Sequence, residues 1–337
     1  MNKSVDGESI KPKHYNLNYR RAEVQEEQLN YTEALRLYLQ AAEGYGEDDN
    51  LDRATALYSA GKMCIVLAQY DKAVDYLTET QAILNGDIQA NQVNLSAVYN
   101  GLANVYYCQG NYDKAFIWYD MALEIVEKKL GENHPVAAHM YDNIGRVFWT
   151  QKKYNEALEY HFKALAIFEK NPSKDYMDIA KIYNSIASVY FEQDKYDDAL
   201  EYLLKALAID EKILGKDHPG TATVYNNIAN VYREQDKYDE ALKYQFKALA
   251  VDEKILGKNH SDTAMDYNNI ALTYGYQGKY KDAFTYYLRA IRIDLDKFGP
   301  EHPDTIKCLD NLHTTYERSK CEEPFEDWLA RQGITPP

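Results

Sequence analysis

One short fragment recurs through this chain at a fixed interval. The alanine of Tyr-x-x-Ala returns every 42 residues, at Ala115, Ala157, Ala199, Ala241 and Ala283. A strict period of this length indicates an array of one repeated supersecondary unit. A unit this short cannot bury its own apolar face, whereas stacked neighbours can. The period therefore predicts a solenoid with a long exposed surface, and a binding role for that surface.

Each repeat contains two runs of apolar residues at helical spacing. Between residues 221 and 257 the first run carries Tyr225, Ile228 and Ala229, and the second begins at Tyr238. A short turn over residues 235–237 separates the runs, and the second run ends at Gly257, since glycine readily adopts the left-handed conformation that closes a helix. Each unit is therefore predicted to be a helical hairpin.

The columns of the first helix read aromatic-x-x-Leu/Ile-Ala/Gly-x-x-aromatic, and the unit continues with KYDEAL, KALA and ILGKxHP. This pattern resembles the tetratricopeptide repeat. Its 42-residue form looks like the repeats of kinesin light chain. The resemblance covers residues 54–318 strongly and 15–46 weakly. It implies an all-α fold, a right-handed superhelical solenoid of about seven tetratricopeptide hairpins closed by a C-terminal helix pair.

We expect a single solenoid over residues 15–332 between two short tails. Some features depart from the regular repeat. Asn18, Arg21 and Ala22 stand where large apolar columns belong, which predicts an N-terminal cap, and Pro172 is expected to stop a helix. The predicted parts are a polar, disordered tail at 1–14, units near 15–46, 54–85, 93–130, 135–171, 177–214, 219–256 and 261–298, a cap at 303–332, and a tail at 333–337.

The composition limits the functional classes to which this protein can belong. The 337 residues carry a net charge of −15 and no run of lysine and arginine, which argues against nucleic acid as the partner. Four cysteines without a CxxC motif favour a reduced, cytoplasmic chain over a disulfide framework or a zinc site. The N-terminus lacks an apolar signal core, and no apolar run is long enough to insert into a membrane.

The first helix of each hairpin carries a stripe of polar residues beside its packed columns. Counting the first aromatic column as position 4, the stripe comprises positions 2, 5, 6, 9, 12 and 13. Asparagine is a mediocre helix former, so its recurrence here requires a reason. In related arrays, such asparagines hold the main chain of a bound peptide, since an amide both donates and accepts. Alternatively, the amides bond to neighbouring helices and stiffen the array. The candidates are Asn100, Asn104, Asn143, Asn184, Asn226, Asn227, Asn230, Asn268, Asn269 and Asn311.

Aromatic and basic residues share this stripe. Tyr107, Trp149 and Phe191 occupy position 12 in three successive repeats, where large rings can anchor a partner or simply pack on the next helix. The cations could take an acidic side chain or a terminal carboxylate, or could be merely solvated. They include Arg146, Lys181 and Arg233.

Catalysis and metal binding have little support in the sequence. His134, His218 and His302 each precede a proline at the inter-repeat turn, which a helix start explains without a metal. No phosphate loop, HExxH or GxSxG motif occurs. We therefore predict a non-catalytic adaptor without cofactor or metal, which binds an extended segment of another protein or peptide in a concave groove. The alternatives are a sensor whose superhelix changes shape on binding a small signalling peptide, and a structural subunit that uses its edges or convex face, with self-association possible.

Overall fold

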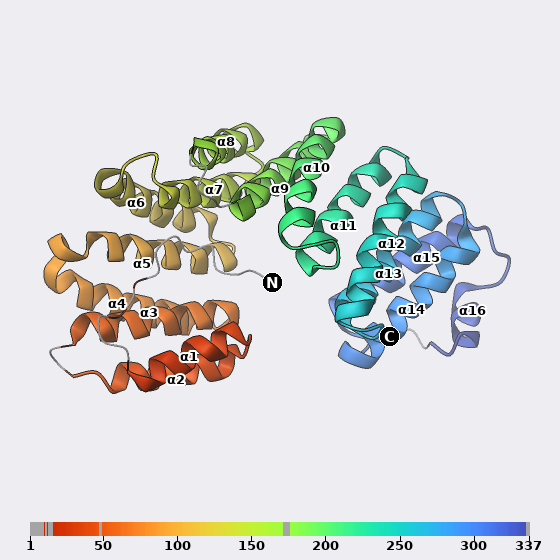
Figure 1. The fold of residues 1–337 in the computed structure, drawn as a ribbon. Helices are drawn as coiled ribbons and strands as arrows, with labels where there is room; N and C mark the ends of the chain where they lie inside the picture. Colours follow the sequence, from red (N-terminus) through yellow and green to blue (C-terminus); the bar gives the residue numbers. More distant parts are fainter. Residues whose placement is uncertain (1–9, 11, 13–15, 47–48, 171–175, 335–337) are drawn as a thin grey trace. The chain divides into compact units, whose positions relative to one another are not determined.

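The computed structural model describes residues 10, 12, 16–46, 49–170 and 176–334, which form helices and contain no strand (Figure 1). This confirms the all-α prediction. The first half contains α1 (Leu17–Glu27), α2 (Tyr31–Glu43), α3 (Asn50–Val66), α4 (Tyr70–Leu84), the 3-10 turn η1 (Asn85–Asp87), α5 (Ile88–Cys108), α6 (Tyr112–Leu130), α7 (Pro135–Thr150) and α8 (Tyr154–Lys170). The second half contains α9 (Tyr176–Glu192), α10 (Tyr196–Ile213), α11 (Pro219–Glu234), α12 (Tyr238–Ile255), α13 (Ser261–Tyr276), α14 (Tyr280–Phe298), α15 (Pro303–Arg318) and α16 (Phe325–Arg331).

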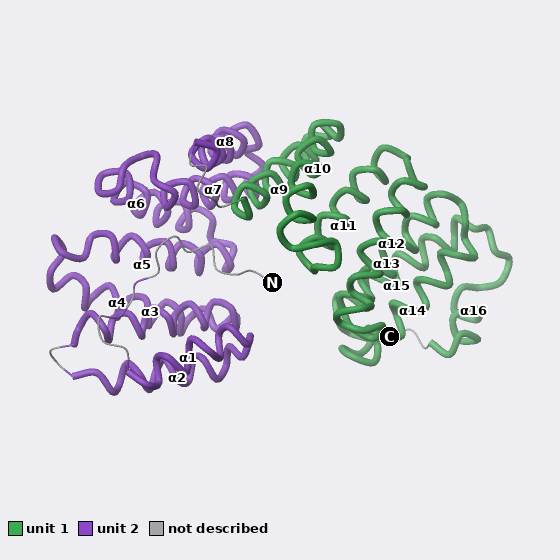
Figure 2. The backbone as a smooth tube through the Cα atoms, viewed as in Figure 1, with its two compact units in different colours: residues 1, 176–337 green, residues 2–175 purple. Residues whose placement is uncertain are grey.

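The chain divides into two compact units, which Figure 2 colours separately. The N-terminal unit covers residues 2–175 and the C-terminal unit covers residues 176–337. Within each unit, consecutive helices from α1 to α8 and from α9 to α15 pack on one another, and rings of α16 contact Tyr316 of α15, so that hairpins stack in chain order. This is the helix-pair packing of a tetratricopeptide solenoid. Pro172 lies outside the described residues, and one uninterrupted right-handed superhelix over residues 15–332 stays a prediction.

The repeat alanine is buried between the two helices of each hairpin. Its exposed fraction is 0% in all seven copies, which allows the two helices to pack with nothing between their backbones but a methyl group. The seven copies are Ala34, Ala73, Ala115, Ala157, Ala199, Ala241 and Ala283.

Successive hairpins are joined by a hydrogen bond that repeats with the sequence. The position-4 tyrosine donates to a glutamate 14 residues earlier, in the second helix of the preceding hairpin. The O···O distances are 2.5 Å for Tyr141–Glu127, 2.7 Å for Tyr225–Glu211 and 2.5 Å for Tyr267–Glu253. These bonds account for part of the tyrosine content of the repeat.

The turn inside each hairpin requires one residue in the left-handed region. Gly110 and Gly278 take it with φ of 75° and 77°, and Asp194 and Asp236 with φ of 57° and 58°. Asp236 lies in the turn expected over residues 235–237, and glycine and aspartate both tolerate this conformation. The other hairpins place Leu29, Ala68, Lys152 and Lys320 there. Gly257 has φ of 92°, as expected for the end of the second helix.

Two first helices begin earlier than the repeat pattern predicts. Helix α3 starts at Asn50 and α5 at Ile88, about one turn before the expected unit boundaries. The predicted tail over residues 1–14 lies almost wholly outside the described residues. Of its members, Ile10 is buried in the cluster that holds Tyr58 and Leu95. No described helix has both the length and the apolar character needed to cross a membrane.

Candidate functional site

The polar stripe on the first helices is the candidate site. Among its asparagines, Asn184, Asn227, Asn230 and Asn268 are partly exposed. Asn100 and Asn143 differ, because each is only 4% exposed.

In the N-terminal unit, amides bond to one another across repeats. Asn143 Nδ2 donates to Asn100 Oδ1 over 3.1 Å, which joins position 6 of α7 to position 5 of α5. The hydroxyl of Tyr119 donates to Asn104 Oδ1 over 2.5 Å. These three asparagines therefore make the interhelical bonds that the alternative interpretation of the stripe expects.

A cation–aromatic stack lies beside these amides. The guanidinium of Arg146 in α7 lies 5.1 Å from the ring centre of Tyr107 in α5. Tyr107 in turn meets Tyr112 edge to face, with centroids 5.6 Å apart. Arg146 is exposed and keeps donors available. Nε1 of Trp149 is buried, and no described group accepts its hydrogen.

Sequence reasoning missed an acid–base pair behind this stripe. His161 of α8 is 1% exposed, and its Nδ1 lies 2.7 Å from Oδ1 of Asp142 in α7. Burial raises the pKa of Asp142, but the hydrogen bond and charge of His161, together with the nearby Arg146 and His139, lower it by more, so the net shift is downward. The sequence contains a signal of this pair. The position of His161 carries Leu77 and Leu203 in other repeats, and Gly145 occupies a first-helix position that usually carries alanine.

Gly145 makes room for the imidazole. A Cβ built on Gly145 would come within 2.7 Å of the His161 ring, which is far inside contact distance. The glycine and the histidine are therefore a matched pair, and together they place a polar group where most repeats have a leucine or a tyrosine.

In the C-terminal unit, the same cross-repeat amide pairing recurs. Asn227 Nδ2 donates to Asn184 Oδ1 over 3.5 Å, and Asn311 Nδ2 donates to Asn268 Oδ1 over 3.2 Å. The Asn184 amide also donates to the carbonyl of Ala180 over 3.0 Å. Unlike Asn100 and Asn143, these asparagines stay partly exposed.

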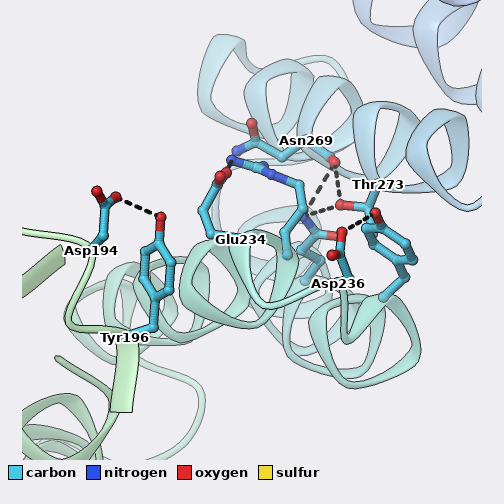
Figure 3. A network of polar contacts seen from close by, with 9 residues as sticks. Asp194, Tyr196, Glu234, Asp236, Asn269 and Thr273 are labelled. Atoms are coloured by element: carbon cyan, nitrogen blue, oxygen red, sulfur yellow. Dashed lines mark hydrogen bonds and ion pairs between the residues drawn. The ribbon is translucent and has the colours of Figure 1, made fainter. Parts of the chain in front are cut away.

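The main chain of Asn269 is also occupied. Gln245 Nε2 donates to the Asn269 carbonyl over 3.1 Å and to the Thr273 hydroxyl over 2.9 Å, and Figure 3 shows both acceptors on α13. Gln245 belongs to the same column as His161, so in both repeats a polar side chain from the second helix reaches the back of the stripe.

Asn226 has a different partner, a buried carboxyl group. Its Nδ2 lies 2.7 Å from Oδ1 of Asp266, which is 2% exposed. Its carboxylate neighbour is Asp252, a residue of α12 that is 9% exposed. Burial, and then the neighbouring Asp252 charge, raise the pKa of Asp266 to about 8 despite the Asn226 bond. The raised pKa favours the protonated form of Asp266.

Arg233 is the most confined cation of the stripe. Its side chain is 14% exposed, and its Nη2 reaches Glu234 Oε1 only at 3.4 Å. No described group accepts from its buried Nε. Lys181, by contrast, is paired with Asp178 over 2.9 Å. The ring of Phe191, which shares the stripe, meets the ring of Tyr196 edge to face, with the two centroids 5.7 Å apart. Arg233 therefore has a donor without a described acceptor, whereas Lys181 donates to Asp178.

The histidines before the prolines act as helix caps. Nδ1 of His134, His218 and His302 accepts the backbone N–H two residues on, at 3.3, 3.0 and 3.3 Å. His260 does the same before a serine, at 3.2 Å. The expected role in starting a helix is confirmed. Within the described residues, no cluster of three or more histidine, cysteine or acidic side chains could hold a metal ion.

Several solved structures have a similar fold. BtubC (BKLC) from P. vanneervenii is 23% identical, with a TM-score of 0.58 over 72% of this chain and 94% of that chain. A putative kinesin light chain from Podosopora anserina is 20% identical, with a TM-score of 0.54 over 61% and 98%. A Rap protein complexed with competence and sporulation factor is 19% identical, with a TM-score of 0.59 over 94% and 90%. No curated protein sequence matches the chain significantly.

A family model gives the assignment directly. The tetratricopeptide repeat model matches residues 94–170, 178–254 and 222–296. These matches include more than half of the chain and follow the hairpins from α5 to α14. The chain belongs to the tetratricopeptide repeat family.

Proposed function

We propose that the chain is a non-catalytic adaptor that captures an extended segment of a partner protein on the asparagine stripe of α9, α11, α13 and α15. The observation that carries this proposal is the partly exposed amide pairs Asn184–Asn227 and Asn268–Asn311. A carboxamide has two donor hydrogens and two acceptor sites, and each cross-repeat bond uses only one of them per residue. The remaining groups can bond to the N–H and C=O groups of a peptide.

The repeat fold itself supports a protein-interaction scaffold. The hydrogen bonds also refine how the stripe works. The amides bond to each other and can bond to a peptide at the same time, so the pairing orients them before the peptide arrives. Preorganised groups lose less entropy on binding, which leaves more of the interaction energy for affinity.

Side-chain selectivity comes from the cations and rings of the stripe. Arg233 of α11 reaches Glu234 only at 3.4 Å, so its guanidinium keeps donor hydrogens for a partner. This group favours a segment that carries carboxylates. Asn230 and Phe191 complete the proposed contacts. The four cysteines are free thiols, which agrees with the reducing cytoplasm as the site of action.

A sensor of a small signalling peptide is the second candidate. It is favoured by one comparison, the Rap protein that was solved with competence and sporulation factor bound. A sensor should become more compact when its peptide binds, whereas a static adaptor should not. Small-angle scattering with and without the captured segment separates the two.

The test is affinity capture from the source lysate with three forms of the protein. The stripe variant carries Asn184→Ala, Asn227→Ala and Asn230→Ala, which removes both members of one amide pair and so leaves neither unsatisfied. The control variant carries Glu240→Ala and Lys243→Ala on exposed positions of α12. Circular dichroism establishes that all three fold.

We expect a partner that wild type and the control retain and the stripe variant loses. A synthetic peptide from that partner should then bind wild type at least tenfold more tightly than the stripe variant. A partner held equally by all three forms would show that binding uses another face.

A further inference from the structure

Four first helices begin after a histidine, which is not among the preferred N-cap residues. Each histidine takes an extended backbone conformation with ψ of 139–150°, and the four are His134, His218, His260 and His302. Elsewhere in the described chain, the side chains that cap a helix belong to Asn16, Asn30, Asp87 and Asn111. The four junctions that carry histidine therefore use a cap of different chemistry.

The histidine caps require a neutral ring. Nδ1 of each ring accepts the backbone N–H two residues on, and a ring nitrogen accepts a hydrogen bond only while it carries no proton. A proton on Nδ1 would bring a second donor against the backbone N–H and would place a positive charge at the positive end of the helix dipole. Histidine side chains commonly change charge between about pH 5 and pH 8, so these caps depend on pH in that range.

Two of the four caps have a carboxylate close to that proton. Nδ1 of His260 lies 3.8 Å from Oδ2 of Asp262, the residue whose N–H it accepts, and Nδ1 of His302 lies 3.6 Å from Oδ2 of Asp304. The two aspartates belong to the first turns of α13 and α15, where negative charge stabilises a helix. A protonated ring at these helices therefore exchanges its cap bond for an ion pair.

The caps of α7 and α11 have no such substitute. Their rings accept from Val136 and Gly220, and neither first turn contains an acidic residue. Among the described residues, neither His134 nor His218 forms an ion pair with a carboxylate. Protonation therefore leaves both helices without a cap and with an added positive charge.

The other charged groups around these two caps do not replace the missing aspartates. The cations in the last turns of the neighbouring helices and in the loops are Lys128, Lys129, Lys170, Lys212, Lys216 and Lys254. The acids there are Glu127, Glu132, Glu169, Asp210, Glu211, Asp217, Asp252 and Glu253.

Most of these acids have other neighbours. Glu127, Glu211 and Glu253 each accept from a tyrosine, and Asp217 pairs with Lys254 over 2.5 Å. The cation that acts on Asp210 is Lys181. Asp252 of α12 instead acts with His260, as Asp294 of α14 does with His302, which adds to the negative charge at the caps of α13 and α15.

We propose that acid opens the first turns of α7 and α11 by protonating His134 and His218, whereas the first turns of α13 and α15 stay closed. One such cap lies in each compact unit, so the same chemistry acts in both. Helix α11 also carries Asn227 and Arg233 of the stripe, so acidification would weaken partner binding at that helix. This last consequence rests on the proposed function, and the opening of the first turns does not.

Residue-resolved hydrogen exchange of the full chain at about pH 7.5 and about pH 5 tests the proposal. The reporters are the amides that bond to the cap carbonyls and close the first turns, Ala138, Ala222, Ala264 and Ile306. After correction for intrinsic exchange rates, protection of Ala138 and Ala222 should fall about fivefold at the lower pH, which is the effect of one typical cap. Protection of Ala264 and Ile306 should change by less than about twofold, because the ion pairs hold those turns. The readout is local because the titration of Asp266 changes the stability of the whole chain as well.

The first variant carries His134→Asn and His218→Asn, which keeps both caps with side chains that do not titrate. Circular dichroism at neutral pH establishes that it folds. Ala138 and Ala222 should then keep their protection at the lower pH. No partner is present in the experiment, so its outcome does not depend on the proposed function.

The reciprocal variant is Asp262→Val, which gives α13 the residue type of Val136 in α7. Ala264 should then lose protection in acid about fivefold, as Ala138 does in the wild type. A wild type that loses protection at none of the four reporters, or equally at all four, would overturn the proposal. So would an unchanged acid response of Ala138 and Ala222 in the asparagine variant, or an Ala264 that stays protected in Asp262→Val.

Discussion

Asp266 is a carboxyl group in a position built for apolar side chains. The residues in its column include Val98, Met140, Ile182 and Val224, which pack against the preceding hairpin. A charged carboxylate there would lose its hydration without gaining a cation, so the group keeps its proton instead. The amide of Asn226 then satisfies part of its hydrogen-bonding capacity. One substitution thus converts an apolar contact into a site whose charge depends on pH.

The stability of the protein should consequently fall between about pH 4 and pH 8. The pKa of Asp266 rises from 3.8 to about 8 on folding, so in this range the folded state holds a proton that the unfolded state has lost. Where the folded state binds more protons, the free energy of unfolding decreases as pH rises, by up to about 1.4 kcal/mol per pH unit. Urea unfolding at pH 5, 6, 7 and 8 measures the slope. Asp266→Asn should flatten it and raise the stability at pH 8, and an unchanged slope would assign the effect to other groups.

The pair of Gly145 and His161 gives a second prediction at this scale. Gly145→Ala places a methyl group against the imidazole and should destabilise the fold by about 1–3 kcal/mol. The next repeat carries Asn184, Ala187 and Leu203 at the corresponding positions. Converting the site to that set, with Asp142→Asn, Gly145→Ala and His161→Leu, should recover most of the loss in thermal unfolding. If the triple variant is no more stable than Gly145→Ala, the steric account is wrong.

At the scale of elements, each hairpin turn requires one residue with a positive φ, and several of the residues that occupy this position are not glycine. Ala68 has φ of 54° and Gly110 has φ of 75° at equivalent turns. An L-residue in the left-handed region costs about 1–2 kcal/mol, against about 0.5–1 kcal/mol for the extra flexibility of glycine in the unfolded chain. A Cβ on Gly110 would contact nothing within 4 Å, so the cost there comes from the backbone alone.

Two reciprocal substitutions test this requirement. Ala68→Gly should stabilise the protein by up to about 1 kcal/mol, and Gly110→Ala should destabilise it by about 1 kcal/mol. Equilibrium denaturation of both variants beside wild type measures the signs. Equal effects in the same direction would mean that side-chain contacts, rather than φ, decide the preference at these turns.

The sequence predicted the helical hairpins better than it predicted the hydrogen bonds of single residues. The 42-residue period located the hairpins, because the repeat alanine is fully buried in all seven copies and the position-4 tyrosine makes the same interhelical bond in three of them. The period did not predict the early starts of α3 and α5, because their first turns lie outside the repeat pattern. The same columns located the stripe, but they did not predict which groups its side chains would bond to. Whether Asn226 meets Asp266 or another amide depends on a single residue in a neighbouring hairpin, which periodicity does not report.

At the scale of the whole molecule, the hydrophobic core is a series of clusters rather than one interior. Two clusters lie within residues 176–337, one around Ile228 and one around Tyr287. Three lie within residues 2–175, around Tyr58, Tyr38 and Ile144. Each unit therefore buries its own apolar side chains. In a repeat array stability is roughly a sum of local terms, so a unit with complete clusters should fold by itself.

The C-terminal unit is accordingly expected to fold as a fragment of residues 176–337. Its clusters draw on α9 to α15 and on Leu329 and Ile334, which close the last hairpin. The fragment should show the helical signal per residue of the full chain and a cooperative thermal transition. Leu329 is fully buried, so Leu329→Ala in the fragment should lower its stability by about 2–5 kcal/mol. Ile213→Ala is the matched control, since Ile213 is 46% exposed and should cost little. A fragment that is unfolded, or that Leu329→Ala leaves unchanged, would mean that residues 2–175 supply part of its core.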